Sequence, residues 1–221
     1  MRMILTRLQE LIGGIYDLAV GYDVYDFLVT DRACLPAEVR TRSGAEDLIV
    51  AQPGGADEEI AMSLYLDPGL LERLGREDPM VRLHDGNVAD WWTALEGVSH
   101  FLYLAWNASY DRPVSLLELE MQAEVDKYVA SYWLMRRQSP EHFPAELRRL
   151  LFERTRIESR LADGREDLYR HASRYAERFC RRLEQLLHGV RCGAEDEVLA
   201  ELRRFYRYTN ARKRAHIERL A

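Results

Sequence analysis

The chain has 221 residues, of which 47% are hydrophobic and 31% are charged. This balance is typical of a folded globular protein, and it excludes a disordered tail or a fibrous repeat. No apolar run approaches the roughly 20 residues that span a bilayer, and charged side chains interrupt the first residues, so we expect no membrane span and no secretory signal. The three cysteines have no metal-ligand spacing, which favours a reducing, cytoplasmic compartment.

Charge is divided unevenly along the chain. Residues 1–127 hold 10 Lys and Arg against 23 Asp and Glu, a balance of −13, whereas residues 128–221 hold 21 against 14, a balance of +7. Such an asymmetry indicates either that the basic part meets nucleic acid or an acidic surface, or that the two parts attract each other within one fold. We favour attraction within one fold.

The first 80 residues predict a small α+β layer. Residues 24–30, 47–52 and 59–67 are short runs rich in β-branched or aromatic side chains and bounded by turn formers, which is typical of strands. Pro53, Gly54 and Gly55 suit a hairpin between the second and third runs. Together with an amphipathic N-terminal helix, these runs predict a three-stranded antiparallel layer. Asp67 and Pro68 then predict the start of a short helix.

From about residue 87 onward, the spacing of apolar residues predicts helices and no strands. Ser115 and Glu118 form a capping box, which is a strong helix start signal. The remaining caps and breakers place helices at about 87–107, 115–139, 144–162, 166–187 and 194–220. Short loops favour antiparallel neighbours, so we predict a five-helix antiparallel bundle. The expected fold class is α+β, mostly α, with residues 1–80 and 81–221 as two domains or as one continuous domain.

The two central helices carry a candidate polar site. Glu96 and His100 lie one turn apart on the first, and Glu120 and Glu124 lie one turn apart on the second, so antiparallel packing would turn the carboxylates toward His100. Imidazole and carboxylate groups are ligands for Mn, Fe or Zn. The candidate catalytic residues are therefore Glu96, His100, Glu120 and Glu124, and His100, Glu120 and Glu124 are candidate ligands for a divalent metal, although the sequence does not favour a bound metal.

Two other interpretations of these residues stay open. Without a metal, a carboxylate that holds His100 in one tautomer would let its other ring nitrogen act as a general base. Alternatively, Glu96 with His100 and Glu124 with Lys127 are ordinary helix-surface pairs, each worth about 0.2–0.5 kcal/mol. The sequence contains no GxGxxG, GxxxxGK[ST], GxSxG or HExxH string, so no common catalytic motif decides between them.

The last 21 residues are basic and aromatic, with seven basic and two acidic side chains. RNA or single-stranded DNA is one hypothesis for this tail, and it requires an exposed, uninterrupted basic face. A surface helix that packs on the acidic part explains the pattern equally well, and a sequence pI near 5.6 argues against a dedicated nucleic-acid protein. The arginines of the candidate face are Arg203, Arg207, Arg212 and Arg214.

Trp91 and Trp92 are adjacent, so on a helix they point about 100° apart, and both can be buried only if the helix is covered on two sides. One of them is therefore a candidate for an interface with a partner. Our first functional hypothesis is a helical binding or adaptor protein that contacts a protein partner or a second copy through aromatic and arginine-rich surfaces. The alternatives are a metal-assisted or general-base hydrolase and a nucleic-acid-binding protein.

Overall fold

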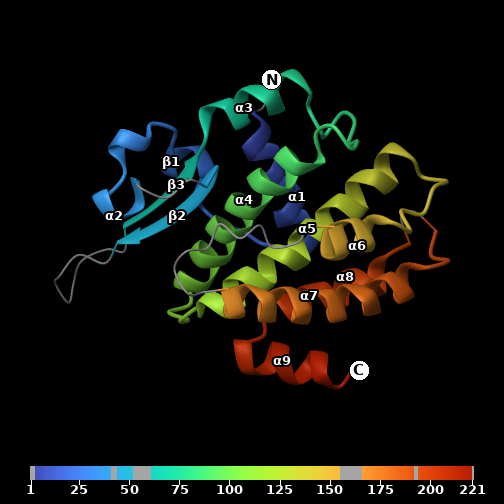
Figure 1. Ribbon diagram of the computed structural model, residues 1–221. Helices are drawn as coiled ribbons and strands as arrows, with labels where there is room; N and C mark the ends of the chain where they lie inside the picture. Colours follow the sequence, from blue (N-terminus) through green and yellow to red (C-terminus); the bar gives the residue numbers. More distant parts are fainter. Residues whose placement is uncertain (1–2, 41–43, 52–60, 155–165, 192–193, 221) are drawn as a thin grey trace.

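The computed structural model describes residues 3–40, 44–51, 61–154, 166–191 and 194–220. Figure 1 shows a small sheet on one side of the long helices α4 (Val88–Ala108) and α5 (Leu116–Gln138). Helix α7 (Glu166–Leu187) packs on α5, and α8 (Asp196–Tyr206) contacts both α7 and the N-terminal helix α1 (Ile4–Tyr16). Helix α9 (Asn210–Glu218) lies outside α7. Because α4 contacts both the sheet and α5, it joins the β layer to the helices.

The sheet is mixed rather than antiparallel throughout. Strands β2 (Glu46–Ala51) and β3 (Ala61–Leu66) pair antiparallel, as predicted. Strand β1 (Leu28–Val29) pairs with β3 in parallel, which gives the order β1-β3-β2. The predicted all-antiparallel layer is therefore wrong at its first strand. The predicted hairpin turn at residues 53–55 lies outside the described residues.

The predicted strand over 24–30 is short because its first half is a 3-10 turn, Val24–Phe27. The side chain of Asp23 accepts a hydrogen bond from the Tyr25 N–H at 2.9 Å. Such local side-chain bonds compete with the extended conformation. A second 3-10 turn (Arg32–Cys34) and a short helix α2 (Ala37–Arg40) then lead toward β2. Helix α3 (Pro68–Arg76) begins where predicted, because Asp67 accepts a hydrogen bond from the Leu70 N–H.

The helical half agrees with the prediction in three helices and differs in two. Helices α4, α5 and α7 match the predicted ranges within two residues. The predicted helix over 144–162 is represented by α6 (Leu147–Arg149) and a π-helical turn (Leu150–Arg154), and residues 155–165 lie outside the described residues. The predicted helix over 194–220 is split into α8 and α9, because Thr209 starts a new helix by accepting a hydrogen bond from the Arg212 N–H. The five-helix bundle is therefore not matched in detail.

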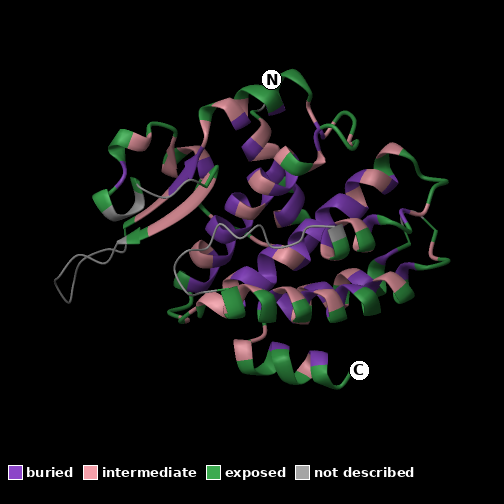
Figure 2. Ribbon diagram, viewed as in Figure 1, coloured by how far each residue is buried: buried purple, intermediate pink, exposed green. Residues whose placement is uncertain are grey.

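One main hydrophobic cluster runs through the described residues from α1 to α9. Figure 2 shows its buried positions along α4 and α5, which lie inside the molecule. A small second cluster, formed by Leu35 and Tyr65, lies apart from it at the sheet. Among the described residues, no helix combines the length and the apolar character needed to cross a bilayer.

Candidate functional site

Three of the four predicted site residues lie together between α4 and α5. Glu96 and His100 share one face of α4, and α5 brings Glu120 opposite them, so that Glu120 Oε1 lies 3.8 Å from His100 Nε2. Glu96, His100 and Glu120 each offer one ligand atom, and these atoms all lie within 4.8 Å of one another. We call these three residues the His100 cluster. They form a compact set of one imidazole and two carboxylates.

A fourth group, Glu46, comes from the start of β2 and was not predicted. Its Oε1 lies 3.4 Å from His100 Nδ1, on the opposite side of the ring from Glu120. Gly97 permits this approach, because a Cβ there would lie 2.9 Å from Leu64 Cδ1 and 3.0 Å from Glu46 Cγ. Glu46 lies 54 residues before His100 in the sequence, so the two side chains meet only because the sheet packs on α4. Gly97 was the one local signal of that close approach.

Glu124, a predicted metal ligand, lies beside the His100 cluster rather than in it. Its Oε1 accepts a hydrogen bond from Lys127 Nζ at 2.8 Å, and the same ammonium group lies 2.6 Å from Glu96 Oε2. Lys127 is buried, so this is not the solvated surface pair that the spacing also allowed. Lys127 thus links Glu124 to the cluster, and Glu96 takes the place predicted for Glu124.

The unusual feature of the cluster is the Nε2 atom of His100. His100 is 5% exposed, and its Nε2 has no hydrogen-bond partner among the described residues. Nearly all buried polar atoms in proteins have such a partner, so an orphaned ring nitrogen requires an explanation. His84 Nε2 also lies 3.8 Å from a carboxylate, that of Glu77, but both side chains are exposed and water can satisfy them.

Burial and the neighbouring charges shift the pKa of each residue of the His100 cluster and of Glu46. Burial alone would lower the pKa of His100, but the neighbouring charges of Glu120 and Glu46 outweigh it and raise that pKa to about 9. Burial raises the pKa of Glu46 and Glu120. Burial also acts to raise the pKa of Glu96, but the charge of Lys127 outweighs it and leaves that pKa lowered. At neutral pH the ring of His100 therefore carries a proton, which a general base would lack and which a metal ion would have to displace.

The four tail arginines do not form one uninterrupted basic face. Arg203 donates to the backbone carbonyl of Ile15, and Arg207 donates to those of Tyr16 and Asp17. These two guanidinium groups therefore satisfy carbonyls at the C-terminal end of α1, which have no partner within the helix. The other two stand over aromatic rings, Arg212 over Tyr208 and Arg214 over Tyr175.

Trp91 and Trp92 are both buried, in contrast to the expectation that one of them faces an interface. Both indole N–H groups donate to Ser131 Oγ at 3.0 Å. Helix α4 is covered by α5 and also by α1, α3 and the sheet, so it has the two covered sides that two adjacent tryptophans require. In this conformation neither tryptophan offers a surface to a partner.

No protein-family model, no curated protein and no solved structure matches this chain. What the chain does is therefore inferred from its own side chains. The His100 cluster is the one group of three or more metal-ligating side chains found within the described residues.

Proposed function

We propose that Glu96, His100 and Glu120 bind a divalent metal ion and that the chain is a metal-assisted hydrolase. The observation that carries this proposal is the orphaned Nε2 of His100, which is buried and faces the carboxylate of Glu120 at 3.8 Å. A metal ion between these groups would satisfy the ring nitrogen and both carboxylates at once. His216 Nε2 is also buried without a hydrogen-bond partner among the described residues, but it lies 2.6 Å from Glu201 Oε1, which leaves no room for an ion as the wider gap at His100 does.

The three ligand atoms are near enough to share such an ion, but they are spread slightly wider than its bonds allow. A metal ion about 2.0–2.2 Å from each ligand requires ligand atoms at most about 4.4 Å apart. The three ligand atoms lie within 4.8 Å of one another, so small side-chain rotations close the site. One imidazole and two carboxylates suit Zn, Mn or Fe. Glu46 at Nδ1 supplies the carboxylate that commonly stands behind a metal-binding imidazole and directs its other nitrogen to the metal.

Three protein ligands leave coordination positions open, which is typical of catalytic rather than structural sites. A metal ion held in this way polarises a carbonyl or phosphoryl oxygen and lowers the pKa of bound water to about 7. Lys127 holds the Glu96 carboxylate in place and adds a positive charge beside the site, and Glu124 positions Lys127. The side chains of Glu96 and Glu124 are 29% and 24% exposed, so substrate would approach from their side.

Isothermal titration of the purified protein with Zn²⁺ and with Mn²⁺ tests the metal site. We expect one ion per chain, and we expect His100→Ala and Glu120→Gln each to weaken binding by about 100-fold, because each removes a ligand. His84→Ala is the matched control, since it removes an exposed histidine at the same distance from a carboxylate, and it should bind as the wild type does. A wild-type protein that binds neither ion would overturn the proposal.

The hydrolase part needs a separate measurement. Protein loaded with the tighter-binding metal would be incubated with p-nitrophenyl acetate and with p-nitrophenyl phosphate, and release of p-nitrophenol would be followed. We expect hydrolysis of at least one ester that His100→Ala abolishes and His84→Ala leaves unchanged. Should the metal bind while neither ester is hydrolysed, the metal site would stand and the hydrolase assignment would fall.

A further inference from the structure

Helix α7 presents a row of exposed arginines on its outer side. They recur every fourth residue, which on an α-helix means a rotation of about 40° and a rise of about 6 Å from each to the next. They therefore follow one line along the helix, while the opposite face of α7 packs into the core. Figure 2 shows the exposed positions recurring along α7. The arginines in this row are Arg170, Arg174, Arg178 and Arg182.

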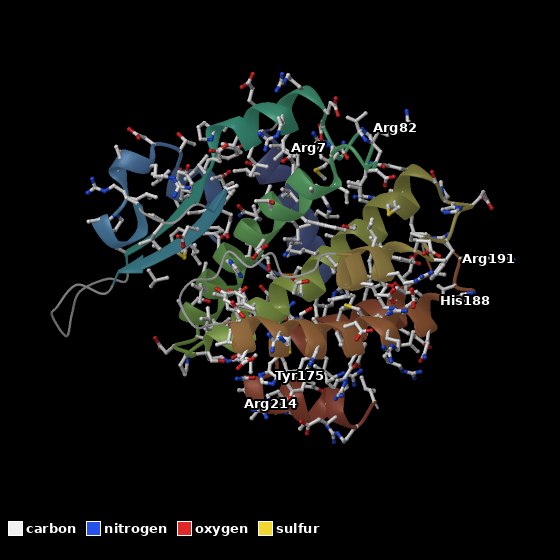
Figure 3. The ribbon with its side chains drawn as sticks, in the orientation of Figure 1. Arg7, Arg82, Tyr175, His188, Arg191 and Arg214 are labelled. Atoms are coloured by element: carbon white, nitrogen blue, oxygen red, sulfur yellow. The ribbon has the colours of Figure 1, made fainter. Side chains whose placement is uncertain are left out.

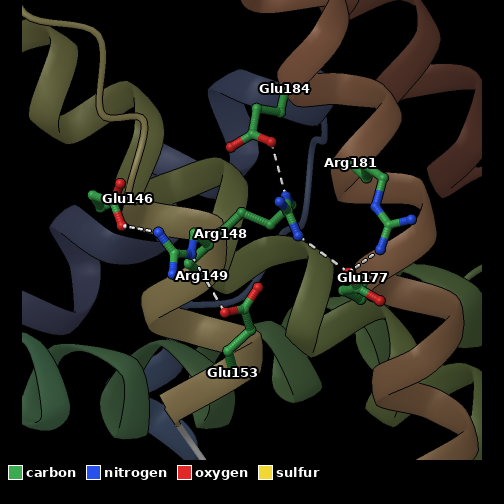
Figure 4. Close-up of polar contacts among 7 residues, drawn as sticks. All are labelled: Glu146, Arg148, Arg149, Glu153, Glu177, Arg181 and Glu184. Carbon is green, nitrogen blue, oxygen red and sulfur yellow. Dashed lines mark hydrogen bonds and ion pairs between the residues drawn. The ribbon is translucent and has the colours of Figure 1, made fainter.

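The acidic side chains of α7 do not neutralise most of this row. Glu177 accepts hydrogen bonds from Arg148 and Arg181, and Glu184 accepts one from Arg148 (Figure 4). Both carboxylates are thus engaged by other arginines, one of which comes from α6. At the N-terminal end of the row, Arg170 pairs with Asp167.

The other three arginines of the row have no hydrogen bond or ion pair with any residue that the structure describes. We call Arg174, Arg178 and Arg182 the arginine ridge. The formal net charge of the chain is −6, yet no acidic side chain in the part that the structure describes pairs with the three arginines of the ridge.

We propose that the arginine ridge binds the phosphate backbone of a single nucleic-acid strand. A strand offers phosphates at regular intervals, and the guanidinium group binds phosphate through two parallel hydrogen bonds. A folded acidic protein presents carboxylates at irregular intervals. An anionic membrane is a plane that binds helices through an apolar face as well as through charge, and the apolar face of α7 is already buried in the core.

The surroundings of the ridge support the same partner. Tyr175 follows Arg174 on α7, and Arg214 of α9 lies 5.6 Å from the centre of its ring. Figure 3 shows Tyr175 and Arg214 side by side at the junction of α7 and α9. Arg214 places a further guanidinium group beside Tyr175, where Glu218 also accepts a hydrogen bond from the Tyr175 hydroxyl. Arg203 and Arg207 of the tail, by contrast, are engaged at the end of α1. The candidate contact with nucleic acid thus moves from the tail to α7.

Fluorescence anisotropy with a labelled oligothymidine of about 20 nucleotides tests this proposal. The ridge variant is Arg174→Gln/Arg178→Gln/Arg182→Gln. Its matched control is Arg40→Gln/Arg76→Gln/Arg82→Gln, which removes the same charge from exposed arginines elsewhere. At about 50 mM salt we expect the ridge variant to bind at least about tenfold more weakly than wild type and the control to bind as wild type does. The slope of log affinity against log salt should become shallower by about 2, because each lost phosphate contact removes about 0.7.

Three results would overturn the proposal. The first is a wild-type protein that does not bind the oligothymidine at low salt. The second is an equal loss in the ridge and control variants, because that would reflect net charge alone. The third is wild-type binding to vesicles with anionic lipid but not to the oligothymidine. Circular dichroism of both variants checks the fold, and EDTA should leave the affinity unchanged, so this test is separate from that of the metal site.

Discussion

Two buried polar centres, one around Asp126 and one around His100, lie on opposite sides of the α4–α5 pair. On each helix, neighbouring residues contribute to different centres. On α4, Ser99 belongs to one centre and His100 to the other. On α5, Asp126 and Lys127 divide in the same way. The first centre faces α1 and α9, and the second faces β2. Both centres use side chains of the same two helices. They differ in whether every polar atom of the central side chain, Asp126 or His100, has a hydrogen-bond partner.

Both carboxylate oxygens of Asp126 are satisfied, although the nearby Tyr206 hydroxyl has no hydrogen-bond partner within the part of the chain that the structure describes. The Asp126 carboxylate accepts hydrogen bonds from Tyr16, from Ser99 at 2.6 Å and from Gln122 at 2.7 Å. In the His100 cluster, by contrast, a buried ring nitrogen has no partner among the described residues. A saturated carboxylate needs nothing more and stabilises the fold, whereas an unsatisfied ring nitrogen is suited to a ligand. This contrast is the reason that the proposed metal site lies at His100 and not at Asp126.

The two lysines of the sequence fall one in each centre. Burial alone would lower the pKa of Lys127, but its contacts with Glu124 and Glu96 outweigh burial and raise it. Lys213 donates to the amide oxygen of Gln122, and burial lowers its pKa to about 7. Arginine cannot lose its proton in this way. Lysine at position 213 therefore gives the Asp126 centre a buried cation that can become neutral.

Removing the satisfied carboxylate of Asp126 should have the largest effect. Asp126→Ala leaves the donors of Tyr16, Ser99 and Gln122 buried without an acceptor, at about 1–3 kcal/mol each. We expect the free energy of unfolding to fall by about 3–5 kcal/mol in urea denaturation at pH 7.5 or so. Asp85→Ala, at an exposed position, should change it by less than about 0.5 kcal/mol. Equal losses in the two variants would contradict the role of Asp126.

The same carboxyl should leave a signature in the pH dependence of stability. Burial raises the pKa of Asp126 from 3.8 to about 6, so between these values the folded state binds more protons than the unfolded state. The stabilisation from this group is full below pH 3.8 and is lost as the pH rises through about 6. Relative to Asp126→Asn, the wild type should therefore lose about 3 kcal/mol over this window. If the unfolding free energies of the two proteins changed with pH in the same way, the raised pKa of Asp126 would be contradicted.

Gly97→Ala should disturb the contact between the sheet and the His100 cluster. The added Cβ would lie 2.9 Å from the buried Leu64 Cδ1 and 3.0 Å from Glu46 Cγ, so these side chains, or the strands that carry them, must shift. Overpacking of this kind costs about 1–3 kcal/mol of unfolding free energy. The displaced Glu46 would also hold His100 less firmly, so metal affinity should fall. Gly75→Ala is the control, because a Cβ there meets nothing within 4 Å. Unchanged stability and affinity in Gly97→Ala would count against the close approach.

The smallest effect on stability is expected at the His100 cluster itself. Replacing a buried pair of charged groups with apolar side chains of similar volume is often neutral or stabilising. We expect His100→Leu/Glu120→Leu to unfold within about 1 kcal/mol of wild type, or to be more stable, while it loses metal binding. A loss as large as that of Asp126→Ala would mean that the cluster supports the fold, and the contrast between the two centres would disappear.

Local signals predicted three of the five helices in the second half of the chain closely. Ser115 and Glu118 mark the start of α5, because a helix cap depends only on four consecutive residues. The Glu118 N–H donates to Ser115 Oγ at 3.3 Å, as predicted. The break at Thr209 was missed because the apolar spacing continues across it, so periodicity alone does not show where one helix ends. The parallel pairing of β1 with β3 was missed for a different reason, since strand order depends on contacts between distant segments.

The site was predictable only in part for the same physical reason. Helical spacing placed Glu96 and His100 together, and antiparallel packing brought Glu120 opposite them. The choice between Glu120 and Glu124 depends on the register and rotation of α5 against α4, which spacing along one helix does not determine. Glu46 joins through the sheet, and Gly97, the one local sign of a close approach, does not identify Glu46 as the group that approaches.

The most direct measurement is anomalous diffraction from a crystal of the full chain grown with Zn²⁺. The account predicts a strong anomalous peak about 2.0–2.2 Å from His100 Nε2 and from one carboxylate oxygen each of Glu96 and Glu120. Glu46 should remain at Nδ1, and the Asp126 centre should show no peak. Zinc that appears only at exposed carboxylates, with His100 Nε2 left unliganded, would contradict the central claim.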